Sequence, residues 1–139
     1  MFYYDVNWLA VLIAAIANMA IGALWFSPML FGKSWMQLSG MTSAKIKVAK
    51  KGMMQKYSVA FIGSLLMAYV LAVIFELTST ITLATASKMA VLVWLGFIVP
   101  VMLGVVLWEG KPVTLYLMNV LYYLVAVLVM ATVLILVSV

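Results

Sequence analysis

Four uninterrupted apolar stretches constrain this chain more than any other feature of its sequence. They run from Val6 to Phe26, from Tyr57 to Leu77, from Lys88 to Trp108 and from Pro112 to Val137. A helix needs about 20 apolar residues to cross a hydrocarbon core of about 30 Å, and none of the stretches has the alternating pattern of membrane β-strands. The sequence therefore predicts an all-α integral membrane bundle of four transmembrane helices.

Composition supports this fold class and restricts the chemistry. Of the 139 residues, 69% are hydrophobic and 8% are charged, whereas a soluble domain is roughly 45–50% apolar and about 25% charged. We expect residues 1–139 to form a single transmembrane domain. Cysteine and histidine are absent, and the only acids are Asp5, Glu76 and Glu109. Thiolate and imidazole ligands and nucleophiles are thus excluded, and we expect no catalytic residues, no cofactor, no metal site and no enzyme activity.

The distribution of lysines predicts how the chain is oriented. All eight basic residues are lysines, and six of them lie in the basic loop, residues 28–56, between the first two spans: Lys33, Lys45, Lys47, Lys50, Lys51 and Lys56. Lys111 lies at the same end of the bundle, and Lys88 alone lies at the other. By the positive-inside rule the basic loop is cytoplasmic and both termini are outside, in a multi-pass protein of the cell membrane. The lysines also favour contact with anionic lipid, whereas nucleic acid is not an expected partner.

The basic loop also contains helix signals. Pro28 suits the first turn of a short interfacial helix that Gly40 would end. Its apolar residues recur at spacings of four and three and so share one face: Phe31, Trp35 and Leu38. Thr42 or Ser43 can cap a second helix, which we expect to run directly into the second span.

Small residues four apart indicate which spans pack together, because membrane helices associate through close approach of their backbones. The first span has Ala10, Ala14, Asn18 and Gly22; the second has Ala60, Ser64, Ala68 and Ala72; the third has Gly96, Pro100 and Gly104. We expect these three spans to form the core of the bundle. The fourth span is dominated by large residues, so we expect it to face lipid or to dock into a groove on another chain.

Polar residues within the spans need partners, because an unpaired amide in hydrocarbon costs several kcal/mol. We expect Asn18 to form an interhelical hydrogen bond, for which Ser64 is a candidate partner. Asn119 and Tyr123, four apart on the fourth span with Tyr122 beside them, are expected to bond between helices as well. Contact with a solute or a small ligand remains the alternative for these residues.

The charged residues near the span ends suggest local pairs. Glu76 and Lys88 lie near the outer ends of the second and third spans, so an ion pair is expected there, with a role in transport as the alternative. Glu109 and Lys111 are expected to pair across the following turn. Pro100 predicts a kink in the third span.

Tryptophans lie near the predicted span ends and in the basic loop: Trp8, Trp25, Trp35 and Trp108. Indole rings prefer the headgroup level of a bilayer, so we expect these four to act as interface anchors.

Two sequence blocks resemble a known family. The first is Val6-Asn7-Trp8-Leu9-Ala10-Val11 followed by Gly22-Ala23-Leu24-Trp25-Phe26-Ser27-Pro28 and Phe31-Gly32-Lys33-Ser34-Trp35; the second is Trp108-Glu109-Gly110-Lys111-Pro112 followed by Asn119 and Tyr122-Tyr123-Leu124-Val125. They are similar to DUF1761, a prokaryotic membrane family of unknown function, whose later block carries a tyrosine-histidine pair. Tyr123 stands at the position of that histidine. The resemblance implies a four-helix membrane protein and no particular activity.

Two functions remain open from the sequence. The first is a structural or accessory subunit of a larger membrane complex, without catalytic chemistry of its own. The alternative is a small-solute transporter or channel that acts as a homo-oligomer. The expected partners are accordingly the lipid bilayer and either other membrane chains or further copies of this one.

Overall fold

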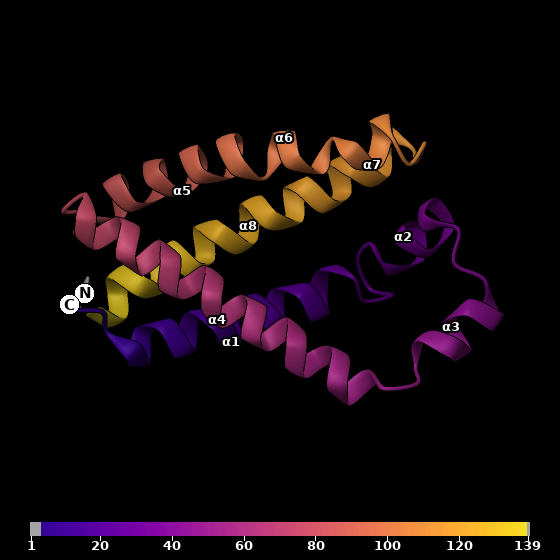
Figure 1. The fold of residues 1–139 in the computed structure, drawn as a ribbon, viewed down its shortest axis with the longest axis horizontal. Helices are drawn as coiled ribbons and strands as arrows, with labels where there is room; N and C mark the ends of the chain where they lie inside the picture. The colour runs from indigo at the N-terminus through magenta and orange to yellow at the C-terminus, as the bar shows by residue number, and fades with distance from the viewer. Residues whose placement is uncertain (1–3, 139) are drawn as a thin grey trace.

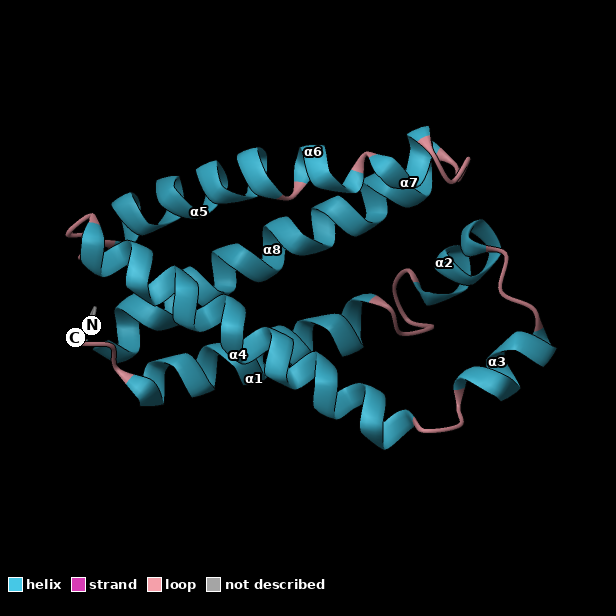
Figure 2. Cartoon of the chain, in the orientation of Figure 1, coloured by secondary structure: helices cyan, strands magenta, loops and turns pink. Residues whose placement is uncertain are grey.

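Residues 4–138 are described by the computed structural model, and they form helices without any strand (Figures 1 and 2). The helices are α1 (Trp8–Trp25), α2 (Gly32–Ser39), α3 (Ser43–Ala49), α4 (Met53–Leu77), α5 (Leu83–Phe97), α6 (Val99–Met102), α7 (Gly104–Leu107) and α8 (Val113–Ser138). Four segments are long and apolar enough to cross a membrane: α1, α4, α5–α7 taken together, and α8. The predicted all-α membrane fold is confirmed.

Local capping residues decide where the helices begin. The Thr82 side chain accepts a hydrogen bond from the Thr85 backbone, and the two residues form a capping box. The third span therefore begins at Leu83, five residues before the predicted start at Lys88. The expectation that the second loop helix runs directly into the second span is wrong, because Gly52 has a left-handed φ of 68° and separates α3 from α4.

The fourth span is the central helix of the bundle, which corrects the expectation that it lies outside the core. α8 packs against both α1 and α5, and Ala126, Met130 and Ala131 are buried along it. The large α8 residues Val127, Met130 and Leu134 belong to one buried cluster with Ala10 and Ala14 of α1, as expected where small residues on one helix leave room for large side chains on its neighbour. The sequence pattern identified the small residues of α1 as a packing surface, but it did not identify the large residues of α8 as their partners.

The third span packs least, so its predicted packing residues are a second correction. A side-chain carbon added at Gly96 would meet nothing within 4 Å, and at Gly104 it would meet only the Trp108 ring. Pro100 is exposed, and the helix is interrupted at Ile98 and at Leu103. Glycine and proline here loosen the helix instead of bringing it close to a neighbour.

A hydrogen bond from α8 stabilises this interruption. The Leu103 amide bonds to the Pro100 carbonyl instead of reaching back four residues to Val99. The Tyr116 hydroxyl donates to the free Val99 carbonyl at 2.8 Å. Trp94 Nε1 donates to the Val120 carbonyl at 2.8 Å and provides a second link between the two spans. The helix is thus interrupted on both sides of Pro100, where the sequence predicts a kink, and a neighbouring helix holds the interruption in place.

The chain reverses sharply between α1 and α2, and Gly32 makes this turn possible. A Cβ at Gly32 would lie 2.5 Å from the Phe26 carbonyl oxygen and 2.8 Å from the Ser27 carbonyl carbon. The Gly32 amide donates to the Ser27 carbonyl at 2.9 Å and closes the turn. Backbone atoms cannot move aside as a flexible side chain can, so only glycine fits.

Gly32→Ala is therefore expected to open the turn and detach α2. We expect a cost of about 1 kcal/mol, the low end of the range for overpacking: Gly32 itself is buried, but residues 28–31 beside it are exposed, so the loop can shift to relieve part of the clash. Limited proteolysis of residues 27–41 and tryptophan fluorescence measure the loosening. Gly96→Ala is the matched control and is expected to cause no loss of stability, since alanine favours a helix by about 1 kcal/mol over glycine. Equal effects of the two substitutions would contradict the geometry of this turn.

Candidate functional site

Three polar side chains from three spans meet inside the bundle. Asn18 on α1 donates through Nδ2 to Ser64 Oγ on α4 at 2.7 Å. The Tyr122 hydroxyl on α8 donates to Asn18 Oδ1 at 3.0 Å. Asn18 and Ser64 are buried, so the expected bond between them is present. We call Asn18, Ser64 and Tyr122 the polar triad.

Close approach of α1 and α8 makes the triad possible. A Cβ at Gly22 would lie 3.0 Å from the Tyr122 hydroxyl oxygen. Gly22 is one turn beyond Asn18 on the same face of α1. The small-residue stripe of the first span thus provides both the hydrogen-bonding amide and the space for the tyrosine ring.

An aromatic cluster extends from the triad to the end of the bundle that carries the basic loop. The Tyr122 ring lies 5.2 Å from the Phe26 ring and 6.3 Å from the Trp25 ring, measured between centroids. Phe26 contacts Trp35 at 5.9 Å, and Trp25 contacts Phe31 at 4.7 Å. The cluster fixes α2 against α1 and α8, and it places Trp25 and Trp35 in packing roles.

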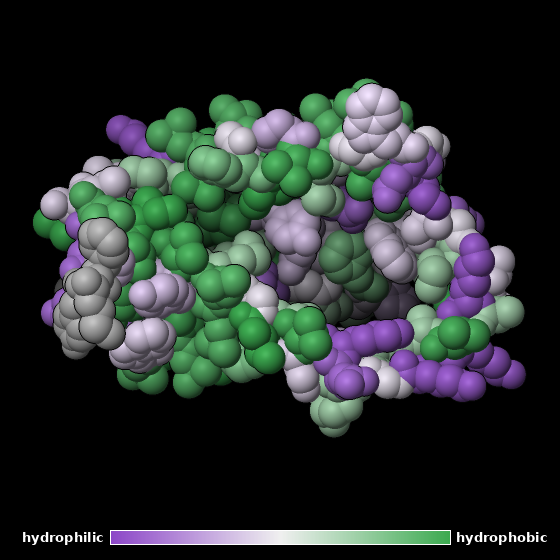
Figure 3. All heavy atoms as spheres, in the orientation of Figure 1, coloured by the Kyte–Doolittle hydropathy of each residue, from purple (hydrophilic) through white to green (hydrophobic). Residues whose placement is uncertain are grey.

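A pocket of about 410 Å³ opens beside this cluster. It is lined by Phe26, Pro28, Gly32, Trp35 and Met36. Figure 3 shows that the bundle is hollowed toward this end, with pale side chains inside the hollow and hydrophilic ones at its rim. Among the described residues, the Trp25 Nε1 atom is the buried side-chain donor that has no hydrogen-bond partner.

The remaining predicted residues of the fourth span take other positions. Tyr123 packs its ring on Tyr122 at 4.9 Å, and Tyr122, which the prediction placed beside the site, makes the interhelical bond instead. Asn119 is half-buried, and no hydrogen bond joins its side chain to another described residue. Tyr122 and Ala126 are four apart on α8, and this small neighbour was the available signal for a close contact with α1.

The opposite end of the bundle brings two acids near each other. Glu76 Oε1 accepts the backbone N–H of Asp5 at 3.2 Å, and both residues line a pocket of about 310 Å³ with Thr80 and Ser138. The expected Glu76–Lys88 ion pair is not formed between these described residues. Because α5 begins five residues early, Lys88 lies more than one helical turn into the span, on an exposed face with Val91.

The turn between α7 and α8 also differs from the expected charge pair. Lys111 Nζ donates to the Ser39 carbonyl at 3.3 Å, at the last turn of α2. Lysine commonly bonds the free carbonyls at the end of a helix. Gly110, with a φ of 66°, separates Lys111 from Glu109, and no ion pair joins the two in the described chain.

The two remaining tryptophans lie on the surface. Trp8 is 67% exposed and stacks on Tyr69 at 5.3 Å, and Trp108 is 87% exposed. Both positions suit the interfacial anchoring that the sequence suggests. Within residues 4–138 no group of three or more His, Cys, Asp or Glu side chains could hold a metal ion.

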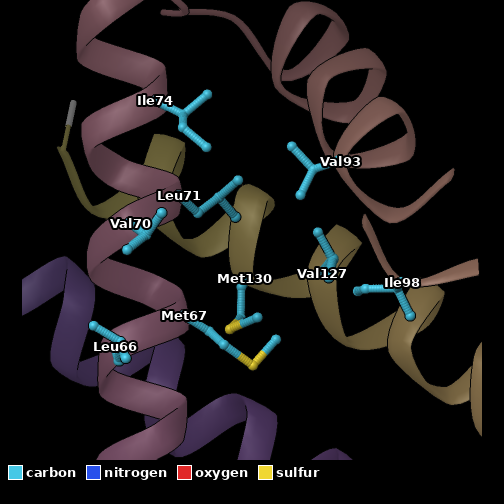
Figure 4. Close-up of a pocket in the computed structure, with 9 residues that line it drawn as sticks. All are labelled: Leu66, Met67, Val70, Leu71, Ile74, Val93, Ile98, Val127 and Met130. Atoms are coloured by element: carbon cyan, nitrogen blue, oxygen red, sulfur yellow. The ribbon is translucent and has the colours of Figure 1, made fainter. Parts of the chain in front are cut away.

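An apolar groove opens between α4 and α5, and Figure 4 shows its lining. The two helices leave the turn at residues 78–82 together and then diverge (Figure 1). The groove has a volume of about 290 Å³ and is lined by Leu66, Met67, Val70, Leu71, Ile74, Val93, Ile98, Val127 and Met130. The side chains in Figure 4 come from α4, α5 and α8 and from the break after α5, so the bundle is open along this side.

Comparison with known proteins identifies the family and adds no functional parallel. A family model described as a protein of unknown function (DUF1761) matches residues 9–135. No curated protein and no solved structure matches the chain. The matched region includes the polar triad, the aromatic cluster and the groove between α4 and α5. The chain therefore belongs to the DUF1761 family of membrane proteins.

Proposed function

We propose that this protein is a non-catalytic accessory subunit that associates with other membrane chains through the groove between α4 and α5. The observation that carries the proposal is the open side of the bundle. α5 and α4 diverge over a surface lined wholly by aliphatic and methionine side chains. An apolar helix of a partner chain would fill this groove and pack against α4, α5 and α8. Methionine, which is unbranched and flexible, adapts to such a partner at Met67 and Met130.

The third span supports the same proposal. Its helical segment, Leu83–Leu107, has the smallest buried share of the four candidate spans. Leu92, Leu95 and Phe97 are exposed on it. Lipid tails satisfy such a surface by themselves, so hydrophobicity alone does not drive association. What favours a partner helix is the combination of this exposed span with a groove of defined shape next to it.

The alternative function, transport by a homo-oligomer, finds less support in the geometry. The polar triad joins three of the four spans, and its side chains are occupied by their own hydrogen bonds. Asn18 is 5% exposed and Ser64 is 4% exposed. A solute path through one copy of the chain would have to break this contact. A path between copies would require self-association, which the following experiment detects.

The test combines the mass of the complex with site-specific cross-linking. The chain has no cysteine, so Leu66→Cys or Val70→Cys introduces a single thiol at the lip of the groove, to which a photoreactive maleimide is attached. Ile16→Cys on the outer face of α1 is the control, since Ile16 is also exposed. After gentle purification from native membranes, we expect different membrane chains in fixed ratio, cross-linked from positions 66 and 70 and not from position 16.

Two outcomes would contradict the proposal. A complex that contains only copies of this chain would favour the homo-oligomeric transporter. Cross-links of equal yield from positions 16 and 66 would show that contact with other chains is not specific to the groove.

A further inference from the structure

A second groove, at the lysine-rich end of α4, joins charged and apolar side chains along one helix. It is lined by Lys51, Gly52, Gln55, Lys56, Val59 and Ala60, and its volume is about 540 Å³. We call it the basic groove. Lys51 lies just before α4, Gln55 and Lys56 lie in its first turn, and Val59 and Ala60 follow one turn later on the same face as Gln55 and Lys56. Its polarity therefore falls from the end of the helix toward the middle of the span.

A hydrogen bond between α3 and α4 fixes the position of Lys56 in this groove. Lys56 Nζ donates to the Ala49 carbonyl at 2.6 Å and thus ties the start of α4 to the last turn of α3. Gly52, with its left-handed φ, provides the reversal between the two helices. The Lys51 ammonium has no hydrogen bond or ion pair to another described residue.

The surroundings of the basic groove are uniformly positive. Six of the eight lysines lie between residues 33 and 56, and no acid occurs between Asp5 and Glu76. Figure 3 shows hydrophilic side chains gathered where Figure 1 places α3 and the start of α4. All residues from 53 to 63 except Met53 and Phe61 are exposed. This half of α4 therefore offers its charged and apolar surfaces to the surroundings, not to the rest of the bundle.

We propose that the basic groove binds one anionic phospholipid of the bilayer. Its phosphate would lie between Lys51 and Lys56, with the Gln55 amide as a further donor, and an acyl chain would follow Val59 and Ala60. Charge complementarity selects an anionic headgroup, because lysines near a membrane surface attract anionic lipid. The apolar side chains of Val59 and Ala60 favour a lipid over a soluble phosphate, because an acyl chain would cover them and a phosphate alone would leave them uncovered. This site does not depend on the partner-binding groove between α4 and α5.

Lipid retention by the intact protein tests this site. The protein is reconstituted in nanodiscs of phosphatidylglycerol and phosphatidylcholine, released, and analysed by native mass spectrometry for bound lipid. We expect one phosphatidylglycerol to be retained in preference to phosphatidylcholine. Lys51→Gln with Lys56→Gln should weaken this binding by about fivefold for each lysine removed. Glutamine keeps a hydrogen-bond donor at position 56, and Gly52 still provides the reversal, so we expect the α3–α4 turn to persist.

A charge-matched control separates a defined site from general attraction. Lys33→Gln with Lys47→Gln removes the same charge from the same loop and touches no residue of the basic groove, so we expect retention to stay near the original level. Equal loss from both double variants would overturn the proposal in favour of diffuse attraction by the loop. Displacement of the lipid by millimolar inorganic phosphate would overturn it in favour of a soluble anion, and retention of phosphatidylcholine to the same extent would exclude charge selection.

Discussion

Ala68→Leu is expected to destabilise the bundle by about 3 kcal/mol, the upper end of the usual cost of overpacking. Ala68 is 0% exposed and belongs to the buried core. It lies one turn beyond Ser64, which bonds to Asn18, so it is on the face of α4 that packs against α1. A leucine there has no empty space to enter, and it must push α4 away from α1.

Thermal and chemical unfolding in a mild detergent measure this loss. Ala60→Leu provides a control on the same stripe, because Ala60 is two turns earlier on α4 and is exposed. We expect Ala60→Leu to leave stability within about 0.5 kcal/mol of the original protein, as surface substitutions usually do. If Ala60→Leu cost as much as Ala68→Leu, the described contact between α1 and α4 would be wrong.

The contact between α1 and α4 was predictable because both of its sides carry a local signal. Residues four apart share a helix face whatever the rest of the chain does. Ala14 and Asn18 on one helix and Ser64 and Ala68 on the other could therefore be matched from spacing alone. The same reasoning fails for α8, whose large side chains look the same in a sequence whether they meet lipid or a stripe of alanines.

The charge pairs were not predictable, since they depend on helix ends that single residues control. The capping box of Thr82 and Thr85 starts α5 early and moves Lys88 away from Glu76. The reversed backbone at Gly110 likewise leaves Lys111 free to reach the Ser39 carbonyl. A shift of one helical turn is small in the sequence, yet it is larger than the reach of an ion pair.

The aromatic cluster could not be predicted from the sequence for a related reason. Trp25 and Trp35 lie where interfacial anchors are expected, and their position in the sequence gives no sign that they pack together. Their contact with Phe26 and Phe31 depends on the turn at Gly32, which folds α2 back toward α8. That turn excludes a side chain on residue 32. The ring contacts that it permits become visible only in the folded structure.

Removing the centre of the polar triad is expected to have the second large effect. Asn18→Leu keeps the approximate shape of the side chain but removes both hydrogen bonds, to Ser64 and from Tyr122. Interhelical hydrogen bonds in membranes are worth about 0.6 kcal/mol on average and up to about 1.7 kcal/mol. Two such bonds, together with the Tyr122 and Ser64 hydroxyls left without this partner, give an expected loss of about 2 kcal/mol.

A double-mutant cycle with Tyr122→Phe tests whether the triad acts as one unit. Tyr122→Phe alone should cost about 1 kcal/mol, the typical net value of one hydrogen bond. In the Asn18→Leu background the same change should cost almost nothing, because the hydroxyl has already lost its acceptor there. Tyr123→Phe is the matched control: the neighbouring hydroxyl makes no hydrogen bond to another described residue, so we expect no loss. Additive costs of the Asn18 and Tyr122 changes would show that the two side chains contribute independently and that the polar triad does not act as one unit.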